Sequence, residues 1–119
     1  SERGLIFDDG AQTRDFVFVE DVVRANLAAA FKPGVVGESF NVGSGRATSI
    51  LDLYRLLAGL TGREEMAPVF APARPGDIRH SFGPVEKARQ RLGFEAGCCL
   101  SCGLAKTWQW FSRAATNQD

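Results

Sequence analysis

The chain has 119 residues, of which 45% are hydrophobic and 24% charged, an ordinary balance for one globular domain. Its 14 Lys and Arg residues balance its 14 Asp and Glu residues, which argues against a general nucleic-acid-binding or membrane-binding surface. No apolar run approaches the ~20 residues that a membrane-spanning helix needs. The first ten residues, "SERGLIFDDG", contain neither an initiator Met nor the apolar core of a signal peptide. We therefore expect a cytoplasmic protein, and we expect this chain to be a piece of a longer one.

The first third of the chain predicts a strand followed by a helix. Residues 5–7 form a short apolar segment, and the Asp-Gly step of residues 8–10 predicts a turn. Residues 15–19, "DFVFV", are aromatic and β-branched, which predicts a strand. From Glu20 the spacing becomes helical, and Pro33 and Gly34 should end that helix. Its apolar face is expected to comprise Val23, Leu27, Ala30 and Phe31.

The middle of the chain predicts a second strand and helix. Residues 38–45, "ESFNVGSG", are expected to form a short strand that breaks into a glycine-rich turn. Thr48 or Ser49 can cap the helix that follows, and Gly59 and Gly62 mark its end. The apolar residues expected on one face of this helix are Ile50, Leu53, Tyr54 and Leu57.

The last third predicts a short extended segment, a loop and two helices. Residues 67–73 should be extended and residues 74–80 should form a loop. A helix should follow Gly83 as its cap with Pro84 at its first position, and the last helix should begin near Leu100. The polar tail, residues 112–119, should fray. This order predicts an α/β fold with short strands and about four helices, whose strands look too few for an independent sheet.

Four motifs allow both a functional and a structural interpretation. The loop "GSGRAT", residues 43–48, could cradle a cofactor phosphate, although a strand-to-helix turn is favoured because Thr48 replaces the third glycine of a dinucleotide fingerprint. "CCLSC", residues 98–102, could be a redox pair or part of a metal site, or simply small residues at a helix entry. His80 could be a base but more often such a residue is structural. Tyr54 fits the core.

Two arginines at loop junctions suggest phosphate binding. Arg14 precedes the expected strand, and Arg74 stands in "ARPGD", where Pro75 stiffens the loop. A guanidinium presents a bidentate, permanently charged fork that suits phosphate oxygens. The structural alternative pairs Arg14 with Asp15 or Asp21, and Arg74 with Asp77, as surface ion pairs.

Five segments in order resemble a known family. They are "GAQTRDFVFVEDVVRANLAA", "ESFNVGSGRATSILDLYRLLAGLTG", "ARPGDIRHS", "KARQRLGFEAG" and "LAKTWQWF". Together they are similar to the C-terminal third of extended short-chain dehydrogenases/reductases, and more narrowly to the NAD-dependent nucleotide-sugar epimerases and dehydratases. The resemblance implies that residues 1–119 are the nucleotide-sugar-binding portion of a two-domain Rossmann-type protein.

The resemblance also implies roles for particular residues. The diphosphate arginines of the family fall on Arg14 and Arg74, the acidic contact to the ribose on Asp77, the residue near the nucleoside on Ile50, and the border of the base on Phe7. The ligand would be a UDP- or dTDP-linked sugar. NAD would be bound by an N-terminal domain that this chain lacks, because the chain has neither the N-terminal glycine motif nor a Tyr-x-x-x-Lys pair.

The resemblance therefore predicts no catalytic, cofactor-binding or metal-binding residue in this chain, and a parent enzyme that is a homodimer. The chain departs from the family pattern at Gly83, Cys99 and Cys102, where an acidic, a hydroxyl and an acidic residue are usual. One alternative is a non-catalytic nucleotide-binding or scaffold relative of the same family. Another is a cysteine-dependent metal or redox module.

Overall fold

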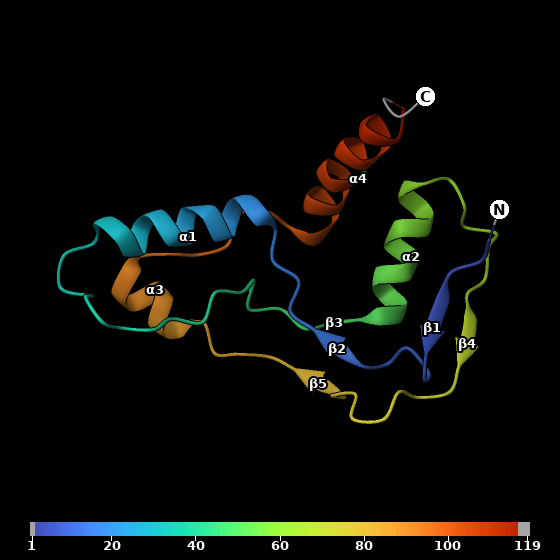
Figure 1. Cartoon of the computed structure of the whole chain (residues 1–119), viewed down its shortest axis with the longest axis horizontal. Helices are drawn as coiled ribbons and strands as arrows, with labels where there is room; N and C mark the ends of the chain where they lie inside the picture. Colours follow the sequence, from blue (N-terminus) through green and yellow to red (C-terminus); the bar gives the residue numbers. More distant parts are fainter. Residues whose placement is uncertain (1, 117–119) are drawn as a thin grey trace. The chain divides into compact units, whose positions relative to one another are not determined.

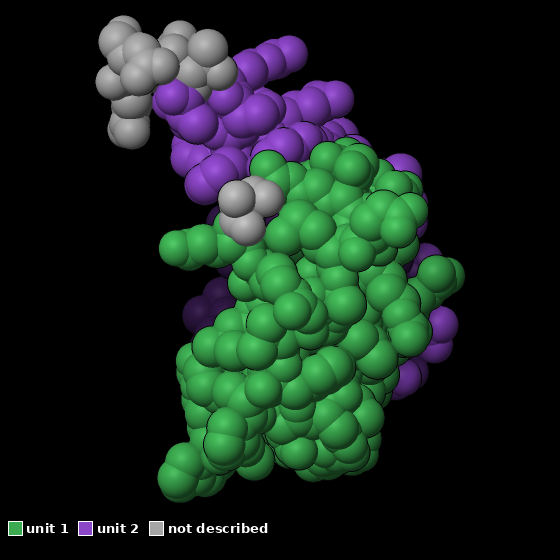
Figure 2. Space-filling model, turned by 90° about the vertical axis from the view of Figure 1, so that its right-hand side faces the viewer, with its two compact units in different colours: residues 1–15, 46–82 green, residues 16–45, 83–119 purple. Residues whose placement is uncertain are grey.

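The computed structural model of the chain describes residues 2–116 and confirms a small α/β fold with short strands (Figure 1). The chain divides into two compact units, and each unit is assembled from two separate segments (Figure 2). Unit 1 comprises residues 1–15 and 46–82, and unit 2 comprises residues 16–45 and 83–119.

The strands of the described residues all belong to unit 1. They are β1 (Leu5–Phe7), β2 (Thr13–Arg14), β3 (Thr48–Ser49), β4 (Val69–Ala71) and β5 (His80–Ser81). β1 pairs in parallel with β4, as Figure 1 shows. β2 lies between β3, to which it is antiparallel, and β5, to which it is parallel. Because β1 and β4 are parallel, their C-terminal ends lie side by side although they are more than 60 residues apart in the sequence.

The turn after β1 joins it to the helix of unit 1. Gly10 has a φ of 77°, and a Cβ placed on it would lie 3.1 Å from the Cβ of Leu51, so both the backbone conformation and the available space require glycine. The Gly10 carbonyl accepts a hydrogen bond from the Leu51 N–H at 2.9 Å. The turn expected at residues 8–10 is thus confirmed, and it holds Ile6 in a buried position.

Helix α2 (Ile50–Leu60) begins as the capping pattern predicts. The Ser49 hydroxyl accepts a hydrogen bond from the Asp52 N–H at 3.0 Å, so Ser49 rather than Thr48 is the cap. Gly62, with a φ of 66°, lies just beyond the helix, whereas Gly59 lies inside it. The expected apolar face is partly covered, and the side chain left most exposed on it is Leu57 at 36%.

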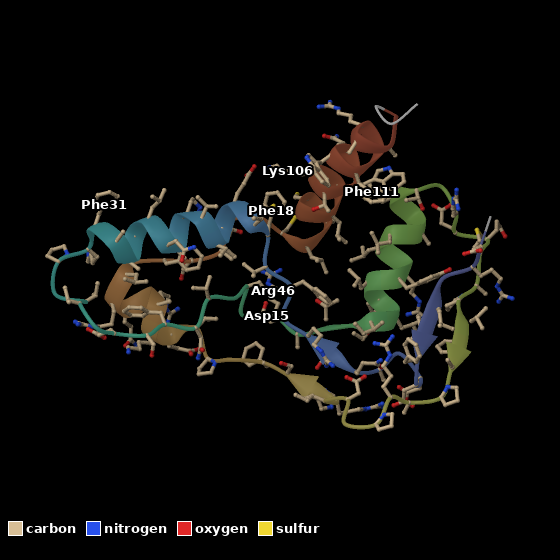
Figure 3. All side chains as sticks on the ribbon, viewed as in Figure 1. Asp15, Phe18, Phe31, Arg46, Lys106 and Phe111 are labelled. Carbon is tan, nitrogen blue, oxygen red and sulfur yellow. The ribbon has the colours of Figure 1, made fainter. Side chains whose placement is uncertain are left out.

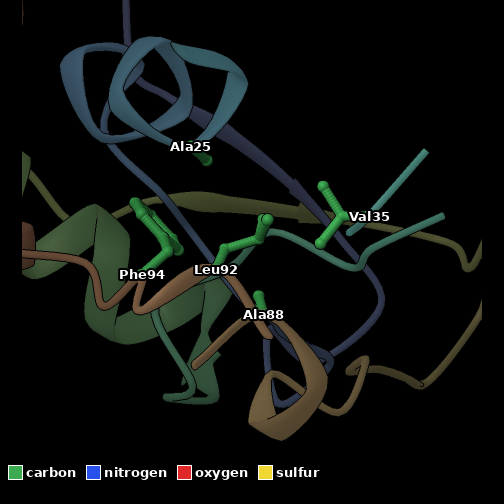
Figure 4. Packing of buried hydrophobic residues seen from close by; sticks show 5 residues of the cluster. All are labelled: Ala25, Val35, Ala88, Leu92 and Phe94. Atoms are coloured by element: carbon green, nitrogen blue, oxygen red, sulfur yellow. The ribbon is translucent and has the colours of Figure 1, made fainter. Parts of the chain in front are cut away.

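Unit 2 contains the main apolar core. Helices α1 (Val19–Phe31) and α3 (Glu86–Leu92) pack together, and helix α4 (Leu100–Thr116) follows. Gly93 ends α3 in a left-handed conformation with a φ of 66°, and the Phe94 N–H returns to the Ala88 carbonyl at 3.3 Å. This reversal carries Phe94 back into the core. The clustered side chains, seen in Figure 4, are Ala25, Val35, Ala88, Leu92 and Phe94.

The expected apolar face of α1 is wrong. Phe31 is 81% exposed, and Val23, Leu27 and Ala30 are exposed as well. Figure 3 shows Phe31 near the end of α1. The helix instead buries Asp21 and Ala25, with Ala28 partly buried. Small alanines allow α1 to approach α3 closely, and the buried carboxylate is compensated by hydrogen bonds, so the larger apolar side chains stay outside.

Two expected strands are also wrong. Residues 15–18 form no strand, and Val19 already belongs to α1. Phe18 packs instead against Gly103 of α4, with the Lys106 ammonium 5.1 Å from its ring centroid (Figure 3). Residues 38–45 form a loop whose Phe40 and Val42 cover the core of unit 2. In both segments the apolar side chains satisfy tertiary packing without strand pairing, which explains why β-propensity misleads here.

The C-terminal helices differ from expectation at their ends. The cap of α3 is Val85, two residues later than the expected cap at Gly83, and the helix itself begins at Glu86. Its first helical hydrogen bond runs from the Arg89 N–H to the Val85 carbonyl. α4 begins at Leu100 as expected. It continues to Thr116, so most of the expected polar tail is helical, and residues 117–119 lie outside the described residues.

Candidate nucleotide-sugar site

All five residues that the sequence selects for substrate binding belong to unit 1. Arg14 is the last residue of β2 and Phe7 the last residue of β1, whereas Ile50 is the first residue of α2. Arg74 and Asp77 lie in the loop between β4 and β5. Two strand ends, a helix start and one loop therefore supply the candidate site.

The loop is built so that its two charged side chains have fixed positions. The Asp77 N–H donates to the Arg74 carbonyl at 3.1 Å, which closes a turn over residues 74–77. Pro75 occupies the second position of the turn, where its restricted φ fits. Gly76 occupies the third with a φ of 78°, a conformation that favours glycine. This is the sequence pattern of a type II turn, and it presents Arg74 and Asp77 from the same short segment.

Arg14 reaches across to this loop. Its Nη2 donates to the Asp77 Oδ1 at 2.8 Å, and its Nη1 donates to the Thr13 carbonyl at 2.7 Å. The two side chains of the ion pair are 27% and 34% exposed. Asp77 is the acidic partner observed for Arg14, and Asp21 pairs with Arg24 instead. A partly exposed ion pair of this kind contributes little to folding and can exchange partners with a ligand.

Arg74 is held by an aromatic ring. Its guanidinium carbon lies 3.7 Å from the ring centroid of Phe7, the distance of a cation–π contact. Among the ion pairs that residues 2–116 form, none involves Arg74, so the alternative pairing with Asp77 is also wrong. A guanidinium that stacks through its face keeps its in-plane N–H donors available for other acceptors.

These contacts join four of the five residues. Phe7 touches Arg74, Arg74 shares a turn with Asp77, and Asp77 binds Arg14. Ile50 stands apart from this series: it is half-buried, and its N–H donates to the Gln12 carbonyl at 3.0 Å.

A second charged cluster beside the site escaped the sequence analysis. Arg79 donates from Nη1 and Nη2 to both carboxylate oxygens of Asp9 at 2.9 Å, and from Nη1 to the Asp8 Oδ2 at 3.0 Å. These hydrogen bonds from Arg79, with one from the Ala11 N–H, lower the pKa of Asp9 to about 2. Asp9 in turn raises the pKa of Arg79. No local sequence pattern predicts this cluster, because Arg79 and Asp9 are 70 residues apart in the chain.

The other motifs have structural roles in unit 1. The His80 Nδ1 lies 2.8 Å from the Thr13 hydroxyl, which links β5 to β2. The Tyr54 hydroxyl donates to the Met66 carbonyl at 2.8 Å, consistent with the core interpretation. The loop of residues 43–48 does not follow a strand, so the strand-loop-helix context that a dinucleotide fingerprint requires is not met there.

Unit 1 also has two open hollows. One of about 430 Å³ lies along α2 and is lined among others by Tyr54 and Phe70, and one of about 480 Å³ is lined by Asp8, Asp9, Phe70 and the residues after β4. Neither is lined by Arg14, Arg74 or Asp77. Arg14, Arg74 and Asp77 thus lie outside both hollows.

Among residues 2–116, no cluster of three or more His, Cys, Asp or Glu side chains could hold a metal ion, and no helix is long and apolar enough to cross a membrane.

Comparison with known proteins decides the family. The family model described as the NAD dependent epimerase/dehydratase family matches residues 2–43. A UDP-glucose 4-epimerase from Mycolicibacterium smegmatis is 43% identical over 106 residues, which are 89% of this chain and 33% of the relative. The chain is a homologue of NAD-dependent nucleotide-sugar epimerases and dehydratases. It spans about a third of the length of the curated relatives it matches.

Solved structures of such enzymes share the fold. A UDP-glucose 4-epimerase from Thermotoga maritima, in complex with UDP-glucose, superposes with a TM-score of 0.88 at 42% identity, over 96% of this chain and 36% of the other. A variant of the UDP-glucuronic acid 4-epimerase from Bacillus cereus, in complex with a fluorinated UDP-sugar and NAD, gives a TM-score of 0.85 at 31% identity. That match covers 92% of this chain and 35% of the other. The resemblance inferred from the five sequence segments is confirmed.

Proposed function

We propose that residues 1–119 form the nucleotide-sugar-binding portion of an NAD-dependent nucleotide-sugar epimerase or dehydratase. The observation that carries this proposal is the contiguous series Phe7, Arg74, Asp77 and Arg14, in a chain similar to epimerases whose structures hold UDP-sugars. The ligand would be a UDP- or dTDP-linked sugar, bound chiefly through its diphosphate.

The diphosphate would be held by two arginines from different segments. Arg14 comes from β2 and Arg74 from the loop after β4, so the two guanidinium groups can neutralise the phosphates from two sides. The Arg14 fork must exchange one hydrogen bond to Asp77 for hydrogen bonds to phosphate oxygens. This exchange costs little free energy because the ion pair is partly exposed to solvent.

The remaining residues would position the nucleoside. Asp77 released from Arg14 is an acceptor for a ribose hydroxyl, and its place in the tight turn keeps it beside Arg74. Phe7, in cation–π contact with Arg74, would border the base. Ile50, half-buried at the start of α2, would supply an apolar contact to the nucleoside.

The hydride chemistry would belong to the parent protein. A bound NAD would supply reversible hydride transfer with a sugar carbon. This chain contains no Tyr-x-x-x-Lys pair, and its Gly43–Thr48 loop does not fit a dinucleotide. We therefore place NAD binding and catalysis outside these residues. The non-catalytic alternative makes the same binding prediction and differs only in the activity of the full gene product.

Calorimetric titration tests the binding site. UDP-glucose and dTDP-glucose are titrated into this chain and into the full gene product loaded with NAD. We expect Arg14→Ala and Arg74→Ala each to weaken binding by about 1.5–3 kcal/mol, the range for hydrogen bonds to charged groups, which corresponds to roughly 10-fold to 150-fold in Kd. The exact factor should be similar for both sugars, because both carry the same diphosphate.

Arg55→Ala is the matched control for these variants. Arg55 lies on α2 of the same unit, has a side chain that is 67% exposed, and pairs with Asp52, which lies one turn earlier on the helix. It should leave binding unchanged. Absence of binding to the NAD-loaded full gene product, or equal losses in the Arg14 and Arg55 variants, would overturn the proposal.

A further inference from the structure

Three cysteines lie together at the start of α4 in unit 2, and the proposed nucleotide-sugar function uses none of them. Cys98 is half-buried, whereas Cys99 and Cys102 are exposed, and all three are free thiols. Cys99 immediately precedes α4, and Cys102 lies in its first turn. The Cys-x-x-Cys spacing therefore coincides with a helix N-terminus, which stabilises thiolates.

The Cys99 sulfur takes the place of a capping oxygen. Its Sγ accepts a hydrogen bond from the Cys102 N–H at 3.3 Å, and the Cys99 carbonyl accepts one from the Gly103 N–H at 2.9 Å. The Ser101 hydroxyl lies 3.3 Å from the same sulfur. The thiol of Cys99 is thus oriented toward the residue with which it could form a disulfide.

Cys98 is held differently. Its N–H donates to the buried carboxylate of Asp21 at 3.0 Å, and its thiol donates to the Cys99 carbonyl at 3.6 Å. The Cys98 thiol is thus engaged with the backbone, whereas the Cys99 sulfur accepts the Cys102 N–H. Cys98 and Cys99 both line a small hollow of about 140 Å³ with Phe16, Phe18 and Leu104, so a small molecule can reach them.

Hydrogen bonds around the pair favour a thiolate at Cys99. Hydrogen bonds from the Cys102 thiol, the Ser101 hydroxyl and the Cys102 N–H lower the pKa of Cys99 from 9.0 to about 7. The neighbouring Cys99 raises the pKa of Cys102. The nearby charged groups are Lys106, one turn further along α4, and Glu20 of α1, which binds the Lys106 ammonium at 3.0 Å.

We propose that Cys99 and Cys102 are a redox-active dithiol that small-molecule disulfides oxidise to an intramolecular disulfide. The Cys99 thiolate attacks one sulfur of the disulfide, forms a mixed disulfide and releases the first thiolate. Cys102 then loses its proton and attacks the Cys99 sulfur, which releases the second thiolate. Two electrons pass from the protein to the small molecule, which leaves as two thiols.

The geometry allows this bond with little movement. Residues three apart on a helix have Cβ atoms about 5–6 Å apart, and a disulfide needs about 3.5–4.5 Å. Since Cys99 precedes the helix, a small adjustment of the cap closes the difference.

Oxidised glutathione is the probe that tests the proposal. The reduced chain is incubated with it near neutral pH, alkylated, and mapped by peptide mass spectrometry. We expect a monomer in which Cys98 is alkylated and Cys99 is linked to Cys102. Cys102→Ser should stop at a stable glutathione adduct on Cys99, because the second thiol is missing. Cys98→Ser is the control and should form the disulfide at the unchanged rate.

The rate of alkylation supplies a second readout in the reduced chain. At about pH 7 a thiol with a pKa near 7 is half thiolate, but its lower basicity reduces its nucleophilicity, so Cys99 should react roughly threefold to fourfold faster than an ordinary cysteine. Cys99→Ser should fold normally, since serine is a favoured cap. A disulfide that involves Cys98, linkage only between chains, or a Cys102→Ser variant without an adduct on Cys99 would each overturn the proposal.

Discussion

Unit 2 buries five apolar side chains in one cluster, whereas in unit 1, among the residues described, the only buried side chains beyond glycine are those of Ile6 and Gln12. Unit 1 is instead held by short strand pairs, backbone bonds through the turn at Gly10, and the ion pairs of Arg14 and Arg79. The proposed ligand site lies entirely in unit 1. Apolar packing therefore stabilises unit 2, whereas unit 1 keeps charged side chains free to bind a ligand and gains less folding free energy from burial.

The largest expected effect is in the core of unit 2. Leu92 is 7% exposed within the cluster, so Leu92→Ala should lower the free energy of unfolding by about 2–5 kcal/mol through lost burial and a cavity. Urea denaturation measures this. Leu27→Ala on α1 is the control, because Leu27 is 53% exposed and its truncation should cost less than about 0.5 kcal/mol. Equal effects of the two variants would refute the assignment of the core.

The next largest effect concerns the buried carboxylate of Asp21. It accepts hydrogen bonds from the Gly97 and Cys98 N–H groups at 3.0 Å, and from Arg24. Asp21→Ala leaves these donors without their acceptor and should destabilise the chain by about 1.5–3 kcal/mol. Asp21→Asn, which keeps one acceptor oxygen, should cost less. Denaturation curves that rank the two variants in the opposite order would contradict this role.

Asp21 should also make stability depend on pH. Burial raises its pKa, but the hydrogen bonds from Arg24, Gly97 and Cys98 outweigh burial and hold the pKa below its ordinary value of 3.8. A group with a lowered pKa stabilises the fold above the unfolded pKa, and that contribution is lost as the pH falls through the folded value. Below pH 3.8 the wild-type chain should therefore lose stability more steeply than Asp21→Asn, in the same denaturation experiment repeated at acid pH.

A smaller effect is expected at the Arg79 cluster of unit 1. Because Arg79 is the main cause of the low pKa of Asp9, Arg79→Gln should return that pKa from about 2 toward 3.8. Carboxyl chemical shifts followed during an NMR titration report the pKa directly. In the wild type the contribution of Asp9 is complete above pH 3.8 and is lost as the pH falls toward about 2. An unchanged Asp9 titration in the variant would mean that Arg79 does not bind it in solution.

The smallest effect on folding is expected at the site itself. The Arg14–Asp77 pair is partly exposed, so Asp77→Asn should change the free energy of unfolding by less than about 1 kcal/mol. Urea denaturation again provides the value. A larger loss would show that the pair is part of what holds unit 1 together, and the contrast between the two units would then be weaker.

Local sequence signals predicted the features that depend on a few neighbouring residues. A cap at Thr48 or Ser49, the turn at residues 8–10 and a helix start near Leu100 were predicted, and the structure confirms them with Ser49 as the cap. The strands expected at residues 15–19 and 38–45 failed because their apolar side chains pack against helices rather than other strands. The exposed face of α1 failed because alanine and a hydrogen-bonded aspartate are buried there instead of leucine and phenylalanine.

The candidate site was likewise predictable only in part. Arg14 and Arg74 were selected from their residue type, their loop positions and the family resemblance, and the structure brings both to one face of unit 1. Their partners were not predictable, since Asp77 and Phe7 lie 63 and 67 residues from them along the chain. The Arg79 cluster was missed for the same reason. The ligand, the homodimeric parent and the cytoplasmic location stay predictions.

The central claim is that Arg14 and Arg74 recognise a diphosphate, and a comparison of UDP with uridine tests it most directly. Calorimetry on the NAD-loaded full gene product gives the ratio of the two affinities for the wild type and for Arg14→Ala. We predict that the wild type prefers UDP, and that Arg14→Ala reduces this preference by roughly 10-fold or more while uridine binding stays the same. An equal loss of affinity for UDP and uridine, or an unchanged preference, would contradict the account.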